Sequence, residues 1–147
     1  MKKIHLLSAL TLTLFFASSA LPAEDLLLTS AKETGAITTP SGLVYLSINE
    51  GSGPQPTARD VVKVHYRGTF ASGKEFDSSY KRNSSIEFPL GGVIPCWTEG
   101  LQRMKIGGKA KLTCPSKLAY GPRGSGGVIP PNTPLLFEVE LLGIKGQ

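Results

Sequence analysis

Histidine is scarce in this sequence: His5 and His65 are the two among 147 residues. His5 lies in the N-terminal segment that we expect below to be removed, so His65 is the one histidine left. Alternation of apolar and polar residues predicts that His65 lies on the polar face of a strand. The usual Ser-His-Asp and Cys-His catalytic arrangements are therefore excluded. The two cysteines, Cys96 and Cys114, do not have the CxxC spacing, and no second histidine accompanies them. We therefore expect no metal and no cofactor.

A strong net charge is also missing. The formal charge is +5 and falls to +3 when Lys2 and Lys3 are left out, which is too little to predict a nucleic-acid partner. The run Gly107-Gly108-Lys109 is similar to a phosphate-binding loop only superficially. Arg103 stands where the first glycine of that motif belongs, and Ala110 replaces its Ser or Thr. Nucleotide binding has no support.

The sequence has no apolar run long enough to cross a membrane as a helix. Its longest, residues 6–17, follows Lys2 and Lys3 and precedes small residues up to Ala23. This layout is typical of a secretory signal peptide, removed after Ala20 or Ala23. We expect a signal peptide over residues 1–23, export to the periplasm or the outside of the cell, and no membrane span after processing.

The remaining chain predicts a short N-terminal tether over residues 24–40 and one domain over residues 41–147. Trp97, Leu101 and Met104 recur at helical spacing before Gly107-Gly108, where we expect the helix to end. One short helix needs a partner surface, so the simplest architecture is an α+β fold with this helix across an antiparallel sheet. Period-two alternation predicts the strands of that sheet at Leu43–Ile48, Val61–Phe70, Lys109–Cys114 and Leu135–Ile144.

Long loops rich in glycine, proline and serine separate these elements, at residues 51–57, 72–85 and 121–134. The third has glycines that permit a tight fold and ends in the rigid run Val128-Ile129-Pro130-Pro131. Binding residues often lie on such constrained loops.

Several segments together, in order and spacing, resemble the FKBP family of peptidyl-prolyl isomerases over about Ser41 to Lys145. The resemblance implies a strongly curved antiparallel β-sheet wrapped around one short α-helix, in agreement with the periodicity. The matching segments are Val64-His65-Tyr66-Arg67-Gly68, Gly73-Lys74-Glu75-Phe76-Asp77-Ser78-Ser79, Gly92-Val93-Ile94-Pro95, Trp97, Ala119-Tyr120-Gly121, Ile129-Pro130-Pro131 and Leu136-Phe137-Glu138-Val139-Glu140-Leu141.

The resemblance also implies an apolar pocket with Trp97 as its floor and Asp77 as its polar edge. The backbone N–H of Ile94 and the hydroxyl of Tyr120 are implied as hydrogen-bond donors to substrate, and Arg82 matches a position that orients the region of Asp77. The implied walls are Tyr66, Phe76, Val93, Ile94, Tyr120, Ile129 and Phe137, and the implied rim residues are Ile86, Ser125 and Val128. Family members often have an aromatic residue at Ile86 and a larger side chain at Ser125, so ligand preference at the rim stays open.

The family's activity implies an enzyme that isomerises prolyl bonds in other exported polypeptides without any acid, base or nucleophile. The alternative is a non-catalytic module or chaperone that binds proline-containing segments, or macrolides of the FKBP-ligand class, in the same pocket. Taken singly, each aromatic residue could equally be core packing. The sequence has no long helical N-terminal extension of the kind seen in dimeric exported relatives, so we expect a monomer.

Cys96 stands at the start of the predicted helix, and Cys114 lies on the inward face of the strand against which that helix should pack. The two residues can therefore meet, and export permits oxidation. A disulfide that closes this loop would stabilise the fold by about 3 kcal/mol. Two buried thiols are the alternative.

Overall fold

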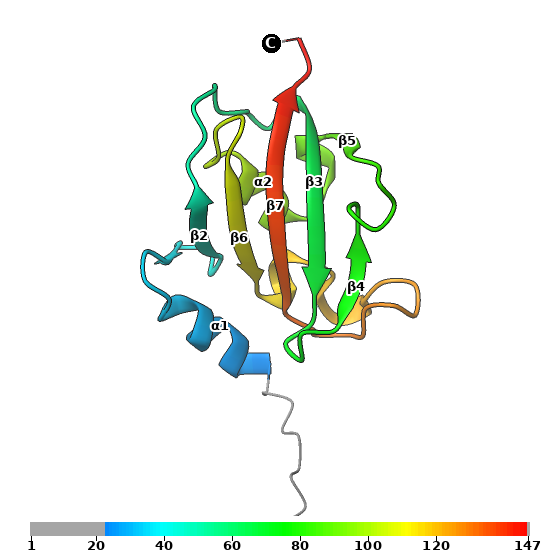
Figure 1. Ribbon diagram of the computed structural model, residues 1–147. Coiled ribbons are helices and arrows are strands. Elements are labelled where there is room, and N and C mark those ends of the chain that lie inside the picture. Colours follow the sequence, from blue (N-terminus) through cyan, green and yellow to red (C-terminus); the bar gives the residue numbers. More distant parts are fainter. Residues whose placement is uncertain (1–22, 147) are drawn as a thin grey trace, which may run out of the picture.

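The computed structural model describes residues 23–146, so the predicted signal peptide lies almost wholly outside the described residues (Figure 1). Its elements are α1 (Ala23–Ala31), β1 (Ile37–Thr38), β2 (Val44–Asn49), β3 (Val61–Thr69), β4 (Glu75–Ser78), β5 (Ile86–Pro89), α2 (Pro95–Leu101), β6 (Lys109–Cys114), β7 (Leu135–Ile144) and three 3₁₀ turns, Leu90–Gly92, Ser116–Leu118 and Gly121–Arg123.

The strands form one curved antiparallel sheet in the order β1-β2-β6-β7-β3-β4, as the sequence analysis expected for the fold class. All of its strand pairs are antiparallel. The first half of β3 pairs with β5 and the second half with β4, so two short strands share its outer edge. Between these two pairings, the N–H of Tyr66 donates to the hydroxyl of Ser79, and the carbonyl of Tyr66 accepts from the N–H of Ser79.

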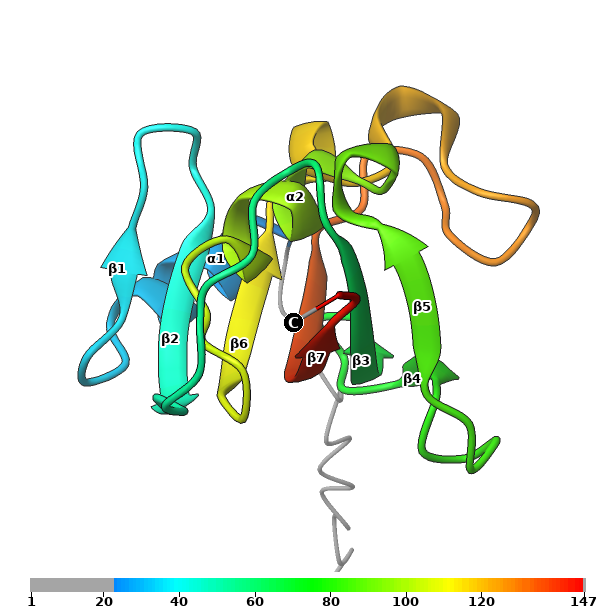
Figure 2. The same cartoon turned by 90° about the horizontal axis from the view of Figure 1, so that it is seen from above.

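Alternation along β3 divides the sheet into two faces. Val62, Val64 and Tyr66 are buried, whereas Lys63 and Arg67 on the opposite face are exposed. The inward residues of β6 and β7 join the same core, and α2 lies over this face (Figure 2). The predicted bounds of β6 and β7 are those of the structure, and the predicted bounds of β2 and β3 differ by one residue at one or both ends.

The helix α2 ends at Leu101, earlier than the expected stop at Gly107-Gly108. Met104 is buried, but it lies in the turn after the helix and not within it. The helix approaches the sheet closely at Gly100, where an added Cβ would lie 2.7 Å from Cδ1 of Leu112. A glycine there allows a helix of only seven residues to pack directly on β6.

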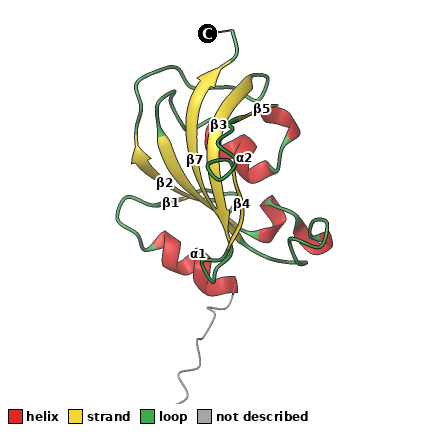
Figure 3. Cartoon of the chain, turned by 45° about the vertical axis from the view of Figure 1, so that its right-hand side comes forward, coloured by secondary structure: helices red, strands yellow, loops and turns green. Residues whose placement is uncertain are grey.

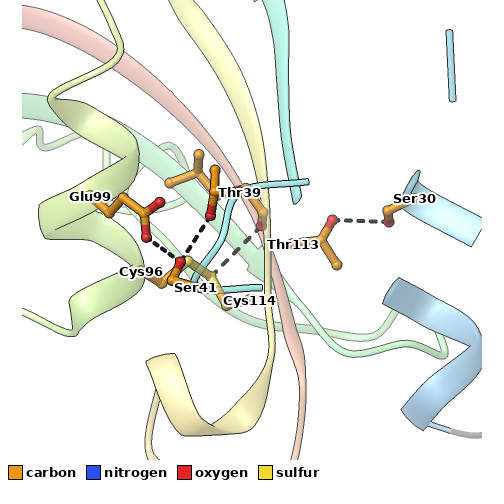
Figure 4. The surroundings of a disulfide bond; sticks show 8 residues. Ser30, Thr39, Ser41, Cys96, Glu99, Thr113 and Cys114 are labelled. Atoms are coloured by element: carbon orange, nitrogen blue, oxygen red, sulfur yellow. Dashed lines mark hydrogen bonds between the residues drawn. A yellow bond between two sulfur atoms is a disulfide. The ribbon is translucent and has the colours of Figure 1, made fainter. Parts of the chain in front are cut away.

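The segment 24–40, which we expected to be a tether, carries the helix α1 and the edge strand β1. The α1 helix packs at one end of the sheet (Figures 1 and 3). There the Thr113 hydroxyl donates to Ser30 at 2.9 Å (Figure 4), and Leu26 is buried. A nine-residue helix without a clear apolar period is marginal by itself, so tertiary contacts with β6 stabilise it. Within residues 23–146, no helix has the length and apolar character needed to cross a membrane.

Cys96 and Cys114 form a disulfide that joins the first turn of α2 to the last residue of β6, with Cα atoms 5.8 Å apart (Figure 4). Both residues are fully buried. Beside them, Ser41 donates a hydrogen bond of 2.5 Å to Oε2 of Glu99, which ties the chain before β2 to the same helix. The disulfide thus fixes the first turn of α2 to the sheet, and the hydrogen bond from Ser41 ties Glu99, further along the helix, to the chain before β2.

Candidate functional site

A cleft of about 570 Å³ opens between α2, the outer edge of β3 and the turn around Tyr120. Its size is within the range of small-molecule binding sites, and its walls are mainly apolar. The residues that line it are Tyr66, Phe76, Asp77, Ile86, Gly92, Val93, Ile94, Trp97, Tyr120 and Phe137.

Trp97 is the centre of a cluster of aromatic rings. Its ring meets Tyr66 edge to face at 5.1 Å between centroids and Phe137 at 5.3 Å, and a tilted contact with Phe88 lies at 5.4 Å. Phe137 in turn meets Phe76 edge to face at 5.7 Å. Edge-to-face contacts of this kind hold ring orientations as well as burying area. The ring of Trp97 at the floor of the cleft and the aromatic rings of its walls therefore hold one another in position.

Gly68 makes room for this cluster. It lies on β3 opposite Phe137 of β7, and a Cβ at this position would be 2.5 Å from Cζ of Phe76 and 3.0 Å from Cε1 of Phe137. Real Cβ atoms essentially never approach another atom closer than 3.0 Å. The absence of a side chain at Gly68 thus sets where the two phenylalanine rings can lie.

Asp77 supplies the cleft's polar edge and is held by two neighbours. The Tyr66 hydroxyl donates to Oδ2 of Asp77, and Arg82 donates from Nη1 to Oδ1. Nη2 of Arg82 also donates to the Tyr66 hydroxyl at 3.0 Å, and its guanidinium carbon lies 5.8 Å from the centre of the Tyr66 ring. The three side chains form a closed network, with Arg82 on the solvent side.

The network lowers the pKa of Asp77. Partial burial acts to raise that pKa, but the hydrogen bond from Tyr66 and the ion pair with Arg82 outweigh it. The pKa of Tyr66 is raised, first by burial and then by its hydrogen bond to Asp77. At neutral pH the site therefore holds one fixed carboxylate and a neutral phenol.

Two hydrogen-bond donors remain free for a ligand. Within residues 23–146, the N–H of Ile94 donates to no protein acceptor, although the carbonyl of the same residue accepts from the N–H groups of Trp97 and Thr98 at the start of α2. The hydroxyl of Tyr120, a residue 38% exposed, has no hydrogen-bond partner in the described part of the chain. Both residues line the cleft.

The structure brings together most of the site residues that the resemblance implied. Of the nine residues expected as floor, walls and polar edge, all except Ile129 line the cleft, and Ile86 joins them at the rim. Arg82 reaches the site through its bonds to Asp77 and Tyr66 instead of lining it. The residues expected on the loop after Tyr120 are not among those that line the cleft. Ile129 belongs to the core, Val128 is 56% exposed, and Ser125 forms a β-bridge with Ile129.

Two contributors were missed from the sequence. Gly92 lines the cleft without a side chain, and Phe88 supports Trp97 from β5 without reaching the cleft itself. The alternation of Ile86 and Phe88 in a short strand is a signal for Phe88, but a four-residue strand is too brief to be recognised by period alone.

The sequence is similar to one family of known proteins. The sequence model for "FKBP-type peptidyl-prolyl cis-trans isomerase" matches residues 53–142. The relative FkpA of Escherichia coli K12 is 53% identical over 115 residues, covering 78% of this chain and 42% of the relative. FkpA of Aeromonas hydrophila is 51% identical over 122 residues, covering 83% and 45%. The chain thus spans less than half the length of these two relatives.

Solved structures give the same result for the fold. The crystal structure of FkpA from Escherichia coli superposes with a TM-score of 0.81 at 49% identity, covering 84% of this chain and 57% of that one. A peptidyl-prolyl cis-trans isomerase from Pseudomonas syringae superposes with a TM-score of 0.76 at 38% identity, covering 85% and 92%. The curved sheet and the single helix over its core face are therefore shared with these proteins.

Proposed function

Since the chain belongs to the FKBP-type peptidyl-prolyl cis-trans isomerases, we propose that it is an enzyme that accelerates rotation about X-Pro peptide bonds in other polypeptides. The observation that carries this proposal is the cleft over Trp97, walled by Tyr66, Phe76 and Phe137 and open to solvent on one side. The cleft is wide enough for a prolyl ring and its neighbours, and its walls exclude water from them.

The chemistry follows from the nature of the peptide bond. Rotation must cross a barrier of roughly 18–20 kcal/mol because resonance between nitrogen and carbonyl keeps the amide planar. The planar amide is more charge-separated than the twisted one, so an apolar cleft disfavours the planar form more. Each reduction of the barrier by about 1.4 kcal/mol gives a tenfold faster rotation. No proton transfer or nucleophile is needed.

Directed hydrogen bonds supply the second part of the mechanism. The N–H of Ile94 and the hydroxyl of Tyr120 belong to residues that line the cleft, and they can donate hydrogen bonds to the carbonyls on either side of a bound proline. Asp77 is kept ionised by Tyr66 and Arg82 and holds the polar edge of the cleft in place. A chain held at two points in a turn is closer to the twisted geometry than a free chain.

We further propose where the protein acts, on which substrates and in which oligomeric state. The chain is exported and processed after Ala20 or Ala23, and its domain over residues 41–147 acts on proline-containing segments of exported polypeptides. It works as a monomer, a proposal that agrees with a cleft lined entirely by residues of one chain. The cleft's volume of about 570 Å³ and its aromatic walls also suit a macrolide of the FKBP-ligand class as a competitive occupant.

The test is an isomerase assay on a short prolyl peptide with wild-type protein and two variants, Asp77→Ala and Phe137→Ala. We expect both to lower kcat/KM while the far-UV circular dichroism of the folded fraction is retained. Phe137 is 3% exposed, so its removal also costs about 3–5 kcal/mol of stability and the assay is run well below its unfolding temperature.

The rival function, a module that binds prolyl segments without turnover, predicts a different pattern. It gives saturable binding to the cleft, for example through quenching of Trp97 fluorescence, but no change in the rate of cis-trans exchange. Unchanged turnover in both folded variants would remove the assignment of the site.

A further inference from the structure

A second groove, of about 490 Å³, lies beside the cleft on the other side of Val93. The chain from residue 91 to residue 98 separates the two. Gly92, Ile94 and Trp97 face the cleft, Gly91, Pro95 and Thr98 face the groove, and Val93 lines both. The groove's other lining residues are Ser41, Glu99, Gln102 and Leu118.

The cleft and the groove also adjoin each other at the turn that contains Leu118 and Tyr120. Leu118 ends the 3₁₀ turn Ser116–Leu118 and lines the groove, and Tyr120, two residues further on, lines the cleft. A polypeptide whose proline occupies the cleft and which continues past Val93 therefore enters the groove directly. The groove belongs to the same surface as the site and has apolar contacts to offer at Val93, Pro95 and Leu118.

Glu99 is the one ionisable side chain among the residues that line the groove, all of which lie in the described part of the chain. Oε2 of Glu99 accepts a hydrogen bond of 2.5 Å from Ser41, which fixes the carboxylate (Figure 4). Among residues 23–146, the one polar partner of Oε1 is Nη2 of Arg103, at 3.9 Å. The glutamate side chain is 29% exposed, so a ligand can reach it.

Two donors of the groove are already engaged within the protein. The Thr98 hydroxyl donates to the carbonyl of Leu90 at 2.8 Å, and Nε2 of Gln102 donates to the carbonyl of Thr98 at 2.8 Å. Glu99 supplies the charged acceptor among the side chains that line the groove, and its Oε1 is therefore best placed for a donor that arrives from outside. A carboxylate held in this way favours a cation or a strong hydrogen-bond donor.

We propose that this groove is a subsite for the polypeptide residues that flank the isomerised proline, and that Glu99 makes it select lysine or arginine at one of those positions. The inference rests on the proposed function. It attributes selectivity to a local contact, because the chain without Lys2 and Lys3 has a formal charge of +3 and its long-range field disfavours cationic peptides.

The test uses peptides with one proline, in which lysine or the uncharged norleucine is placed in turn at the two positions before and the two positions after it. For each peptide, kcat/KM is measured by exchange NMR without a coupling protease, and Kd by titration of Trp97 fluorescence. We expect lysine to be preferred by about two- to fivefold at one position or at two adjacent ones, the range of an exposed ion pair. The preference should disappear in 1 M salt.

Charge variants identify the residue responsible. In Glu99→Gln, which keeps an acceptor for Ser41, the lysine-to-norleucine ratio should fall to about one, and in Glu99→Lys it should invert in favour of glutamate peptides. Glu87→Gln is the matched control, because it removes a carboxylate from the exposed face of β5, away from both hollows, and should leave the ratio as in wild type.

The outcomes separate the two proposals. Turnover of norleucine peptides without any lysine preference, or with a preference that Glu99→Gln does not alter, overturns the subsite and leaves the enzyme standing. A lysine-dependent Kd without turnover supports the subsite and contradicts the enzyme. Neither turnover nor binding with any peptide overturns both.

Discussion

Replacing Gly68 by alanine should damage the cleft far more than the fold. The new Cβ would lie 2.5 Å from Cζ of Phe76, and ordinary contact begins at 3.4 Å, so the ring must move by roughly 0.9 Å. Phe137, at 3.0 Å, is also pushed. We expect a cost of about 1–3 kcal/mol in stability from this overpacking. Displacement of two walls by nearly 1 Å should lower kcat/KM by about tenfold to a hundredfold.

Gly143→Ala is the control. Gly143 lies on the same pair of strands, opposite Lys63, and a Cβ there would meet nothing within 4 Å. Both variants are compared with wild type by thermal unfolding and by kcat/KM on a prolyl peptide. The loss of activity should be confined to Gly68→Ala, and ring protons of Phe76 and Phe137 should shift only in that variant.

Wild-type activity in a folded Gly68→Ala protein would refute the reasoning, because it would mean that the positions of these two rings do not matter for turnover. Equal losses in Gly68→Ala and Gly143→Ala would refute it as well. Such a result would assign the effect to the strand pair and not to the cleft.

Three further outcomes are expected. Replacing Cys96 and Cys114 by alanine should cost about 3 kcal/mol and lower Tm, and an unchanged Tm would show that the disulfide does not stabilise the fold. The carboxyl of Asp77 should titrate below 3.8 by NMR, and stability gained from its ionisation should be lost as pH falls through that titration; a midpoint above 3.8 would contradict the network. Burial and the hydrogen bond to Glu140 raise the pKa of Tyr80 to about 12 from the usual 10. The protonated phenol therefore stabilises the fold fully below pH 10, and this contribution should be lost as the pH rises towards 12. The Tyr80→Phe variant, which has no phenol to titrate, should not show this loss.

The main strands could be predicted from sequence because each has several alternations of apolar and polar residues, as Val62, Val64 and Tyr66 illustrate. The strands β4 and β5 have four residues each and lie within or after a serine-rich loop, which leaves too few alternations for a period to be recognised. The α1 helix was missed for another reason. Its contacts with β6, such as that of Ser30 with Thr113, are tertiary and have no local signal.

The cleft residues could be named because several motifs resembled one family in order and spacing, and not because any one of them is distinctive. Ile129 shows the limit of that method: it lies in a matching motif, yet it is not among the residues that line the cleft. Gly68 and Phe88 show the opposite limit. They act through the rings of Phe76 and Trp97, so their role becomes visible only when the distances between atoms are known.

Exchange NMR tests most directly whether the cleft over Trp97 accelerates cis-trans isomerisation of a prolyl bond. The measurement uses a peptide in which both isomers are populated at equilibrium. We predict a cis-trans exchange rate that rises in proportion to added protein, together with contacts from the proline ring to the indole of Trp97. Contacts to Trp97 without any gain in exchange rate would contradict the account.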